Sequence, residues 1–187
     1  MDFENRRKLS LSCDRSNKGS VDTGIKELVE TINNFQNIFT TSSCAGRVAV
    51  IKKINAKKTD SELLFCSHSK LADEKPIIDS LSPEKNEGNV WILFQPSILH
   101  ICCKTIDDAT WLFARARKAG YKRTGIISVK ENVMVEIIGT DFIEHLLYDL
   151  EGIYYTRDSL KALTSHLNNK FDMNLKKISA FNRSLRE

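Results

Sequence analysis

Three segments of the chain repeat apolar side chains at the spacing of an amphipathic α-helix. The first covers 22–34, and the second follows Thr105-Ile106-Asp107-Asp108, whose spacing is typical of a capping box, and ends at Gly120. The third covers about 156–183. The apolar positions that define them are Ile25, Leu28, Val29 and Ile32; Ala109, Leu112, Phe113 and Ala116; and Leu160, Leu163, Leu167, Phe171, Leu175 and Ile178.

Six short runs rich in β-branched and aromatic residues predict strands. They are Arg47–Ile54, Glu62–His68, Asn89–Gln95, Ile98–Cys103, Gly125–Lys130 and Asn132–Ile138. The last two are too close for a helix between them and predict a hairpin, and 77–81 predicts one short helical turn. Helices and strands do not alternate regularly, so the pattern predicts an α+β fold with a mixed or antiparallel sheet of about six strands and three main helices. The length of 187 residues favours a single domain over 1–187.

Composition excludes several classes of protein. Hydrophobic residues make up 41% and charged residues 28%, as in ordinary globular domains, and no apolar run approaches the ~20 residues of a membrane helix. No secretory signal is present and the number of Cys is five, so we expect reduced thiols and a cytoplasmic protein. The Cys and His lack metal-ligand spacing, so we expect no metal, and no glycine-rich motif supports a Rossmann or P-loop site.

The net charge of +4 is concentrated at the C-terminus, since 157–187 holds seven basic and three acidic residues. A basic helix face attracts the phosphates of a nucleic acid, although lysines and arginines also simply solvate the outside of a helix. The candidates for phosphate contacts are Lys170, Lys176, Lys177 and Arg183.

Two polar segments stand out as candidate binding sites. Residues 14–22 gather charged and hydroxyl side chains before a helix N-terminus, which suits either an anion site or an elaborate helix cap. Residues 40–47 place four hydroxyls, a thiol, Gly46 and Arg47 between the first helix and the first strand. This is a donor-rich turn for a carboxylate, ribose or phosphate, or else a polar loop that continues into a strand.

Two histidines and one turn complete the candidate chemistry. His68 and His100 each lie at a predicted strand and suit a general base, although a histidine in a strand is often structural. Thr124-Gly125 forms either a tight turn near a ligand or the start of the hairpin.

Taken in order, these segments resemble the tRNA wybutosine-synthesizing protein 3 family. The matching elements are DRSxKGSVD at 14–22, TTSSCAGR at 40–47, SH at 67–68, PxxLH at 96–100, DDA at 107–109, GYxxTGI at 120–126 and VEI at 135–137. The resemblance implies a non-Rossmann methyltransferase that uses S-adenosylmethionine. It also implies a substrate, N-4 of the tricyclic guanine derivative just 3′ of the anticodon of phenylalanine tRNA, after an aminocarboxypropyl arm has been attached.

The resemblance and the residue types together give candidate roles. We expect Asp14 or His100 to accept the proton released by methyl transfer, and Arg47 to bind a carboxylate of the cofactor or of the aminocarboxypropyl arm. Phe39, Trp91 and Tyr121 are candidates for stacking on the base. The expected binding residues for cofactor and substrate are Ser16, Lys18, Ser42, Ser43, Cys44, Gly46, Arg47, His68, Thr124 and Gly125.

The chain departs from the family pattern after VEI. Where the family commonly has Arg, this sequence has Ile138, and we expect Lys122 or Arg123 to replace it. Leu146 stands near a common family proline. The alternative function is a non-catalytic RNA-binding or scaffolding protein of the same fold.

Overall fold

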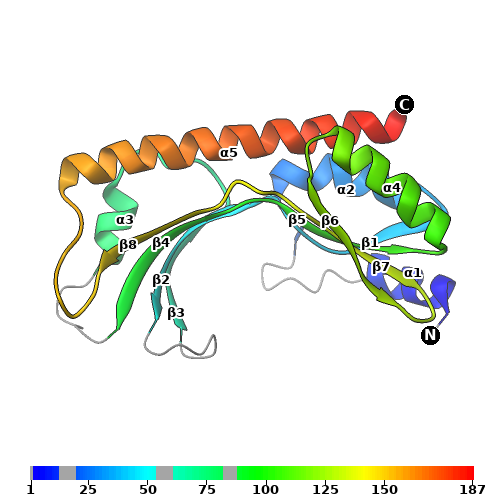
Figure 1. The fold of residues 1–187 in the computed structure, drawn as a ribbon, viewed down its shortest axis with the longest axis horizontal. Coiled ribbons are helices and arrows are strands. Elements are labelled where there is room, and N and C mark those ends of the chain that lie inside the picture. The colour runs from blue at the N-terminus through cyan, green and yellow to red at the C-terminus, as the bar shows by residue number, and fades with distance from the viewer. Residues whose placement is uncertain (1, 13–19, 54–60, 82–87) are drawn as a thin grey trace. The chain divides into compact units, whose positions relative to one another are not determined.

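A computed structural model of the chain describes residues 2–12, 20–53, 61–81 and 88–187. Their contacts divide the chain into two compact units. Unit 1 comprises Met1–Ala45, Pro96–Thr140 and Asn174–Glu187, and unit 2 comprises Gly46–Gln95 and Asp141–Met173. Each unit is built on a four-stranded antiparallel sheet (Figure 1). The expected single domain over 1–187 stays a prediction.

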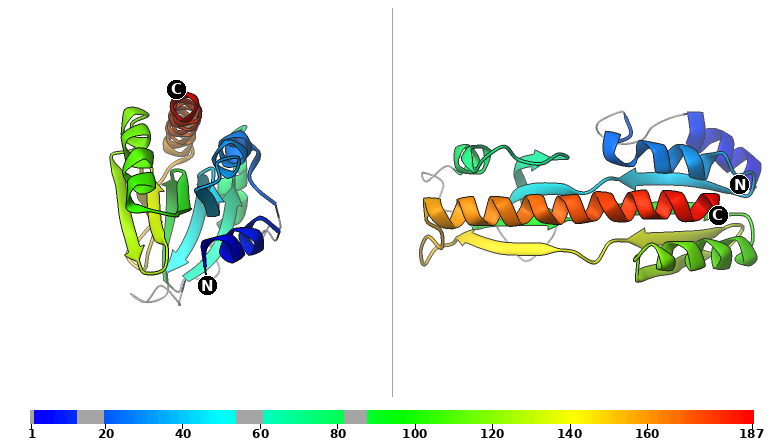
Figure 2. Two further views of the ribbon diagram at one scale, coloured as in Figure 1. Left: turned by 90° about the vertical axis from the view of Figure 1, so that its right-hand side faces the viewer. Right: turned by 90° about the horizontal axis from the view of Figure 1, so that it is seen from above.

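The sheet of unit 1 has the strand order β1-β5-β7-β6. Its strands are β1 (Ile38–Cys44), β5 (Ile98–Cys103), β7 (Val133–Ile138) and β6 (Arg123–Val129). Buried Leu99, Ile101 and Val135 belong to the core on the face covered by helices. The 3-10 helix Thr23–Ile25 leads into α2 (Lys26–Asn33), and the C-terminal part of α5 (Arg157–Arg186) lies between α2 and α4 (Ile106–Lys118), as Figure 2 shows.

The other face of this sheet carries only α1 (Phe3–Ser12), which lies at one end of it among the described residues (Figure 1). We call the uncovered part the open face of unit 1.

The boundaries of α4 follow the sequence signals that predicted them. The Thr105 hydroxyl accepts a hydrogen bond from the Asp108 backbone N–H at 3.1 Å, and the Asp108 carboxylate accepts one from the Thr105 N–H at 2.9 Å, which completes the capping box. At the other end Gly120 adopts φ +94°, and the Tyr121 N–H reaches the Ala116 carbonyl at 2.9 Å. The helix therefore ends in the left-handed glycine conformation that an L side chain rarely adopts.

The sheet of unit 2 has the order β3-β2-β4-β8. Its strands are β3 (Ser61–Ser67), β2 (Arg47–Lys53), β4 (Asn89–Gln95) and β8 (Ile143–Tyr148). The N-terminal part of α5 and α3 (Lys75–Ser80) lie on one face, where Phe94 packs edge-on against Phe171 with ring centroids 6.0 Å apart. None of the described helices combines the length and hydropathy needed to cross a bilayer.

The structure confirms the α+β class and corrects its details. The described residues form two sheets with eight strands, all paired antiparallel, where one sheet of about six strands was expected. Most of 40–47 is not a turn: it belongs to β1, which pairs with β5, and only Ala45 and Gly46 lie between β1 and β2. The strand β8 and the helix α1 were not predicted, whereas the short helix α3, the β6–β7 hairpin and the long α5 were.

Candidate functional site

One residue from each strand of unit 1 contributes to a row that crosses the open face. Ser42 on β1 pairs with His100 on β5, His100 pairs with Glu136 on β7, and Glu136 pairs with Gly125 on β6. The register of β1 shifts between Thr40 and Ser42, and this bulge aims the Ser42 side chain at His100. The row therefore brings together three residues predicted as site residues and one, Glu136, that was not.

Hydrogen bonds connect the first three members of this row. Ser42 Oγ lies 2.7 Å from His100 Nδ1, and His100 Nε2 lies 3.1 Å from Glu136 Oε2. A carboxylate only accepts, so the network assigns the proton of the neutral imidazole to Nε2 and makes Nδ1 the acceptor for the Ser42 hydroxyl. The side chains of His100 and Glu136 are 30% and 36% exposed, so this chain of polar groups is reachable from solvent.

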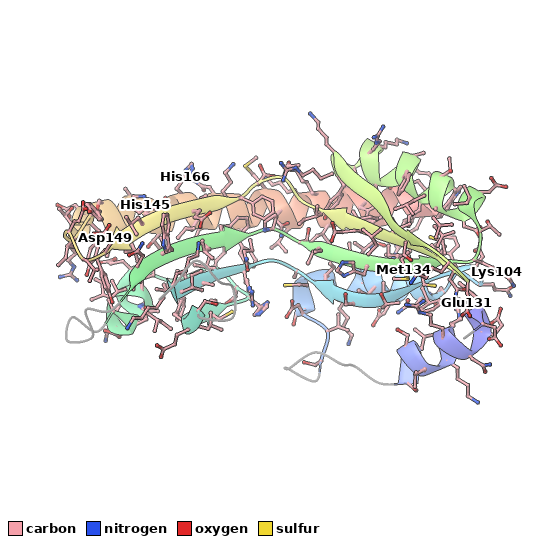
Figure 3. All side chains as sticks on the ribbon, turned by 60° about the horizontal axis from the view of Figure 1, so that its bottom comes forward. Lys104, Glu131, Met134, His145, Asp149 and His166 are labelled. Atoms are coloured by element: carbon pink, nitrogen blue, oxygen red, sulfur yellow. The ribbon has the colours of Figure 1, made fainter. Side chains whose placement is uncertain are left out.

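Helix α1 covers the part of the sheet that borders the open face. The ring of Phe3 packs edge-on over Phe39 with centroids 5.1 Å apart, and Cys102 and Met134 complete this small buried cluster. Met134 is labelled in Figure 3. The Arg7 guanidinium holds the helix in place, because it donates to three backbone carbonyls at and beyond the end of α2. The apolar cluster thus ends where the polar row begins.

The row is open at its β6 end, where Gly125 lies, and an arginine lies nearby on the same strand. A Cβ added to Gly125 would meet no atom within 4 Å, so the space beside Glu136 is unfilled. Arg123 is exposed and pairs directly with Ile138, the position at which an arginine was expected from the family pattern. The register therefore places the Arg123 guanidinium on β6, directly across from the position on β7 where the family arginine is missing.

A buried asparagine fixes the ends of the two strands that carry Ser42 and His100. Asn174 on α5 donates to the Ala45 carbonyl at 2.6 Å and accepts from the Ser97 N–H at 2.8 Å. The Asp22 carboxylate accepts from the Ala45 N–H at 3.0 Å, so it ties down β1 and makes no side-chain cap to the following 3-10 helix. The Tyr121 hydroxyl lies 2.8 Å from Ser97 Oγ, and burial raises the pKa of Tyr121 to about 12.

The remaining predicted residues of unit 1 lie apart from the row or beyond the described structure. Asp14, Ser16 and Lys18 fall outside the described residues. Ser43 pairs with Leu99, whose side chain lies on the helix-covered face, and Cys44 pairs with Ile98 at the end of β1. Thr124 donates to the Tyr121 carbonyl at 3.0 Å and so stabilises the turn after α4.

Three predicted binding residues belong to unit 2. Gly46 adopts φ +100°, which explains why a glycine stands between β1 and β2. Arg47 donates from Nε to Gln95 Oε1 at 2.6 Å across the β2–β4 pair. His68 follows β3, with Nε2 3.7 Å from Cys66 Sγ.

The basic candidates on α5 differ in their surroundings. Lys170 is half-buried in unit 2 and pairs with Asp141 at 3.4 Å, so it is not an open phosphate contact. In unit 1 Lys176 and Arg183 are exposed. Lys177 is half-buried, with Cε 3.8 Å from the position of a Cβ on Gly120.

Of the three aromatic candidates for base stacking, only one keeps accessible surface. Phe39 and Tyr121 are fully buried, in the α1 cluster and in the core of unit 1. Trp91 is half-buried on β4 of unit 2.

Comparisons with known proteins match almost the whole chain. The model of the family described as Methyltransferase TYW3 matches residues 5–187. The tRNA wybutosine-synthesizing protein 3 homolog of Danio rerio is 33% identical over 178 residues, which cover 92% of this chain and 70% of that protein.

A curated archaeal relative and a solved archaeal structure extend this match. The tRNA(Phe) 7-((3-amino-3-carboxypropyl)-4-demethylwyosine(37)-N(4))-methyltransferase 1 of Pyrococcus horikoshii is 31% identical over 175 residues, which cover 89% of this chain and 88% of that protein. The solved structure of the PH1069 protein from Pyrococcus horikoshii superimposes with a TM-score of 0.87 at 27% identity, covering 98% of this chain and 96% of that one.

Proposed function

We propose, on the premise that the chain belongs to the methyltransferase TYW3 family, that it methylates N-4 of the tricyclic wybutosine precursor base in phenylalanine tRNA with S-adenosylmethionine as methyl donor. The observation that carries this proposal is the family match along 5–187, together with the archaeal relative whose name states the same substrate and the same nitrogen. The family match runs along nearly all of the chain, and the alignment covers 88% of the archaeal relative.

The open face of unit 1 offers groups that fit the reactants. Glu136 and Arg123 present a carboxylate and a guanidinium beside the space left by Gly125. An amino-acid group carries the complementary ammonium and carboxylate, and both S-adenosylmethionine and the aminocarboxypropyl arm contain such a group. S-adenosylmethionine supplies an electrophilic methyl group on a sulfonium when bound. The donor set of this face therefore suits the cofactor or the substrate arm.

The hydrogen-bonded row gives the released proton a path. When the ring nitrogen gains a methyl group it loses the hydrogen it carried, and the Ser42 hydroxyl is the exposed end of the chain of polar groups. In the proposed step the Ser42 oxygen takes that proton while its own proton passes to His100 Nδ1. Glu136, at 3.1 Å from Nε2, then stabilises the resulting imidazolium. A positioned general base of this kind raises the reaction rate about 10²–10⁴-fold.

We assign phosphate contacts of the tRNA to Lys176, Lys177 and Arg183 in unit 1. The close approach of Lys177 to Gly120 brings α5 next to the end of α4, where exposed Arg117 adds positive charge and Lys118 pairs with Glu187. Clustered cations of this kind bind nucleic acid through counterion release.

The alternative is a non-catalytic RNA-binding protein of the same fold. It predicts tRNA binding without turnover and without saturable S-adenosylmethionine binding. The two functions are separated by incubating the protein with labelled S-adenosylmethionine and tRNA from cells that lack this methylation. After nuclease digestion, the proposal requires label in a tricyclic nucleoside, and its absence with correctly folded protein and intact tRNA contradicts it.

The proton acceptor is identified in the same assay. His100→Gln should lower turnover by ~10²-fold or more with little change in cofactor affinity, whereas Asp14→Asn should not. Glu136→Gln removes the charge at 3.1 Å from the imidazole and should cost about 10- to 150-fold. Glu30→Gln, in an exposed pair with Lys26 on α2, is the matched control and should leave turnover unchanged. If Asp14→Asn gives the larger loss, His100 is not the acceptor.

A further inference from the structure

Unit 2 also has a sheet face that its helices leave uncovered. Along β4, fully buried Val90, Ile92 and Phe94 alternate with half-buried residues at 91, 93 and 95, and Phe94 packs on α5. The half-buried residues therefore face away from α3 and α5, since successive side chains of a strand point to opposite faces. We call this side the open face of unit 2.

An indole lies at the centre of this open face. Trp91 pairs directly with Ile51 on β2 and with Leu146 on β8, and Leu93 follows two positions along β4. Leu63 on β3 pairs with Ile51 and is 54% exposed, so these five side chains lie on four adjacent strands. The apolar surface therefore measures about 15 Å across the strands and about 7 Å along them. Its dimensions are those of one or two flat aromatic rings.

Two cations flank the apolar surface. The Lys53 ammonium lies 4.9 Å from the centroid of the Trp91 ring and 2.8 Å from Glu144. Arg47 stands at the other end of β2, where its Nε donates to Gln95. Arg47 and Lys53 are six steps apart along an extended strand, or about 20 Å. The Lys53 ammonium, paired with Glu144, occupies the position above the half-buried Trp91 ring, so one cation already marks the site where a second flat group would lie.

We propose that the open face of unit 2 binds unstacked nucleobases of single-stranded RNA, with Trp91 as the stacking platform and with Arg47 and Lys53 contacting the flanking phosphates. A base takes the position of the Lys53 ammonium above the ring, and the ammonium turns to a phosphate. The proposal rests on the proposed function in one respect, because that function makes a tRNA the source of the single-stranded segment.

The size and charge of this face favour RNA over a second copy of the chain. A stable protein interface buries about 800 Å² on each partner and has few charges at its centre. The apolar surface here is about a tenth of that, and its cations lie where a polyanion would run. Every nucleobase has a flat face that stacks on an aromatic ring, and one such contact strengthens RNA binding about 5- to 150-fold.

The fluorescence of Trp91 provides a direct test. The chain has two tryptophans, and the other is Trp111, which packs on Phe35 in unit 1. Trp111→Phe therefore leaves Trp91 as the sole indole without altering the open face of unit 2. Titration with a single-stranded heptanucleotide RNA should quench its emission to saturation, and the same sequence in a perfect duplex should quench it far less.

Two substitutions extend the test to affinity. Trp91→Leu should weaken binding of the heptanucleotide about 5- to 150-fold, and Trp91→Phe should restore part of the loss. Val129→Ser, which removes an exposed apolar side chain from β6 of unit 1, is the matched control and should not change affinity. Lys53→Gln should lower the slope of log affinity against log salt by about 0.7. Lys26→Gln, which changes an exposed side chain of α2, should leave that slope unchanged.

Three results would overturn the proposal: no quenching by the single strand, equal quenching by the duplex, or an emission change that follows protein concentration without RNA. The last, together with a dimer in sedimentation velocity, would assign the face to self-association. The methylation assay on Trp111→Phe separates this proposal from the proposed function. Methyl transfer without quenching refutes only the platform, and quenching without methyl transfer refutes only the methyltransferase.

Discussion

Replacement of Asn174 by alanine should destabilise unit 1 more than the matching change at Asn168 destabilises unit 2. Both asparagines lie on α5, and each makes one donor and one acceptor bond to backbone groups of a connecting segment. Asn174 binds the Ala45 carbonyl and the Ser97 N–H, and Asn168 binds both backbone groups of Leu71 at 2.8 and 2.9 Å. The two asparagines therefore differ mainly in how deeply they are buried.

The expected cost follows from that difference. Asn174 is 1% exposed, so its removal leaves a carbonyl and an N–H that water does not reach. An unsatisfied buried backbone group costs about 1–3 kcal/mol, which gives about 2–6 kcal/mol for the pair. Asn168 is half-buried, so water replaces part of what it loses, and about 1–2 kcal/mol is expected. A cost near 4 kcal/mol is a large part of the 5–15 kcal/mol that typically stabilises a domain.

Urea unfolding at neutral pH measures both variants, and the midpoints are compared at unchanged slope. Asn174→Ala should also lower methyl transfer, because Ala45 and Ser97 adjoin the strands that carry Ser42 and His100. Asn168→Ala should leave the rate per folded molecule unchanged. Equal destabilisation by the two substitutions would refute the argument from burial.

Three further results are expected. Gly125→Leu should fold with normal stability, because nothing lies within 4 Å of the new Cβ, yet its KM for tRNA or cofactor should rise at least about 10-fold as the side chain fills the space beside Glu136. Lys176→Gln combined with Lys177→Gln should flatten the salt dependence of tRNA binding by about 1–2 in slope without changing cofactor affinity, and an unchanged slope would assign both charges to ordinary solvated surface. Burial raises the pKa of Tyr121 from 10.0 to about 12, so the unfolded state loses its proton first, and about 2 kcal/mol of stability should disappear between pH 10 and 12. Tyr121→Phe should remove this part of the alkaline decline in urea midpoints.

The parts of the fold that sequence predicted are those in which the signal is local. The capping box of Thr105 and Asp108, the glycine that ends α4 and the apolar stripe of α5 each depend on residues within a few positions of one another. Strand β1 was missed because hydroxyl side chains occupy its outer half, and only pairing with β5 makes that half a strand. Helix α1 was missed because Phe3 is its single buried side chain, and its position depends on Arg7 and on carbonyls more than 25 residues away.

The candidate site divides in the same way. Residue type and motif selected Ser42, His100 and Gly125, but the row that joins them exists only through the register of four strands. Glu136 was missed as a partner of His100, although a lone carboxylate between Val135 and Ile137 in an apolar run was a usable signal. That signal marks Glu136 as a candidate residue only, because sequence spacing carries no information on which strands pair, and so the pairing of Glu136 with His100 was not predictable.

Because Phe3 of α1 packs over Cys102, the reactivity of this thiol reports whether α1 is attached to the sheet. The thiol lies with Met134 and Phe39 under the Phe3 ring, and burial raises its pKa, so a thiol reagent reacts with it only when α1 lifts from the sheet. The rate of Cys102 modification in the intact protein therefore measures how often α1 detaches from the sheet. Because the same strand carries His100 two residues away, a molecule that occupies the polar row and braces α1 would slow that reaction, and its binding could be followed through the rate at which Cys102 is modified.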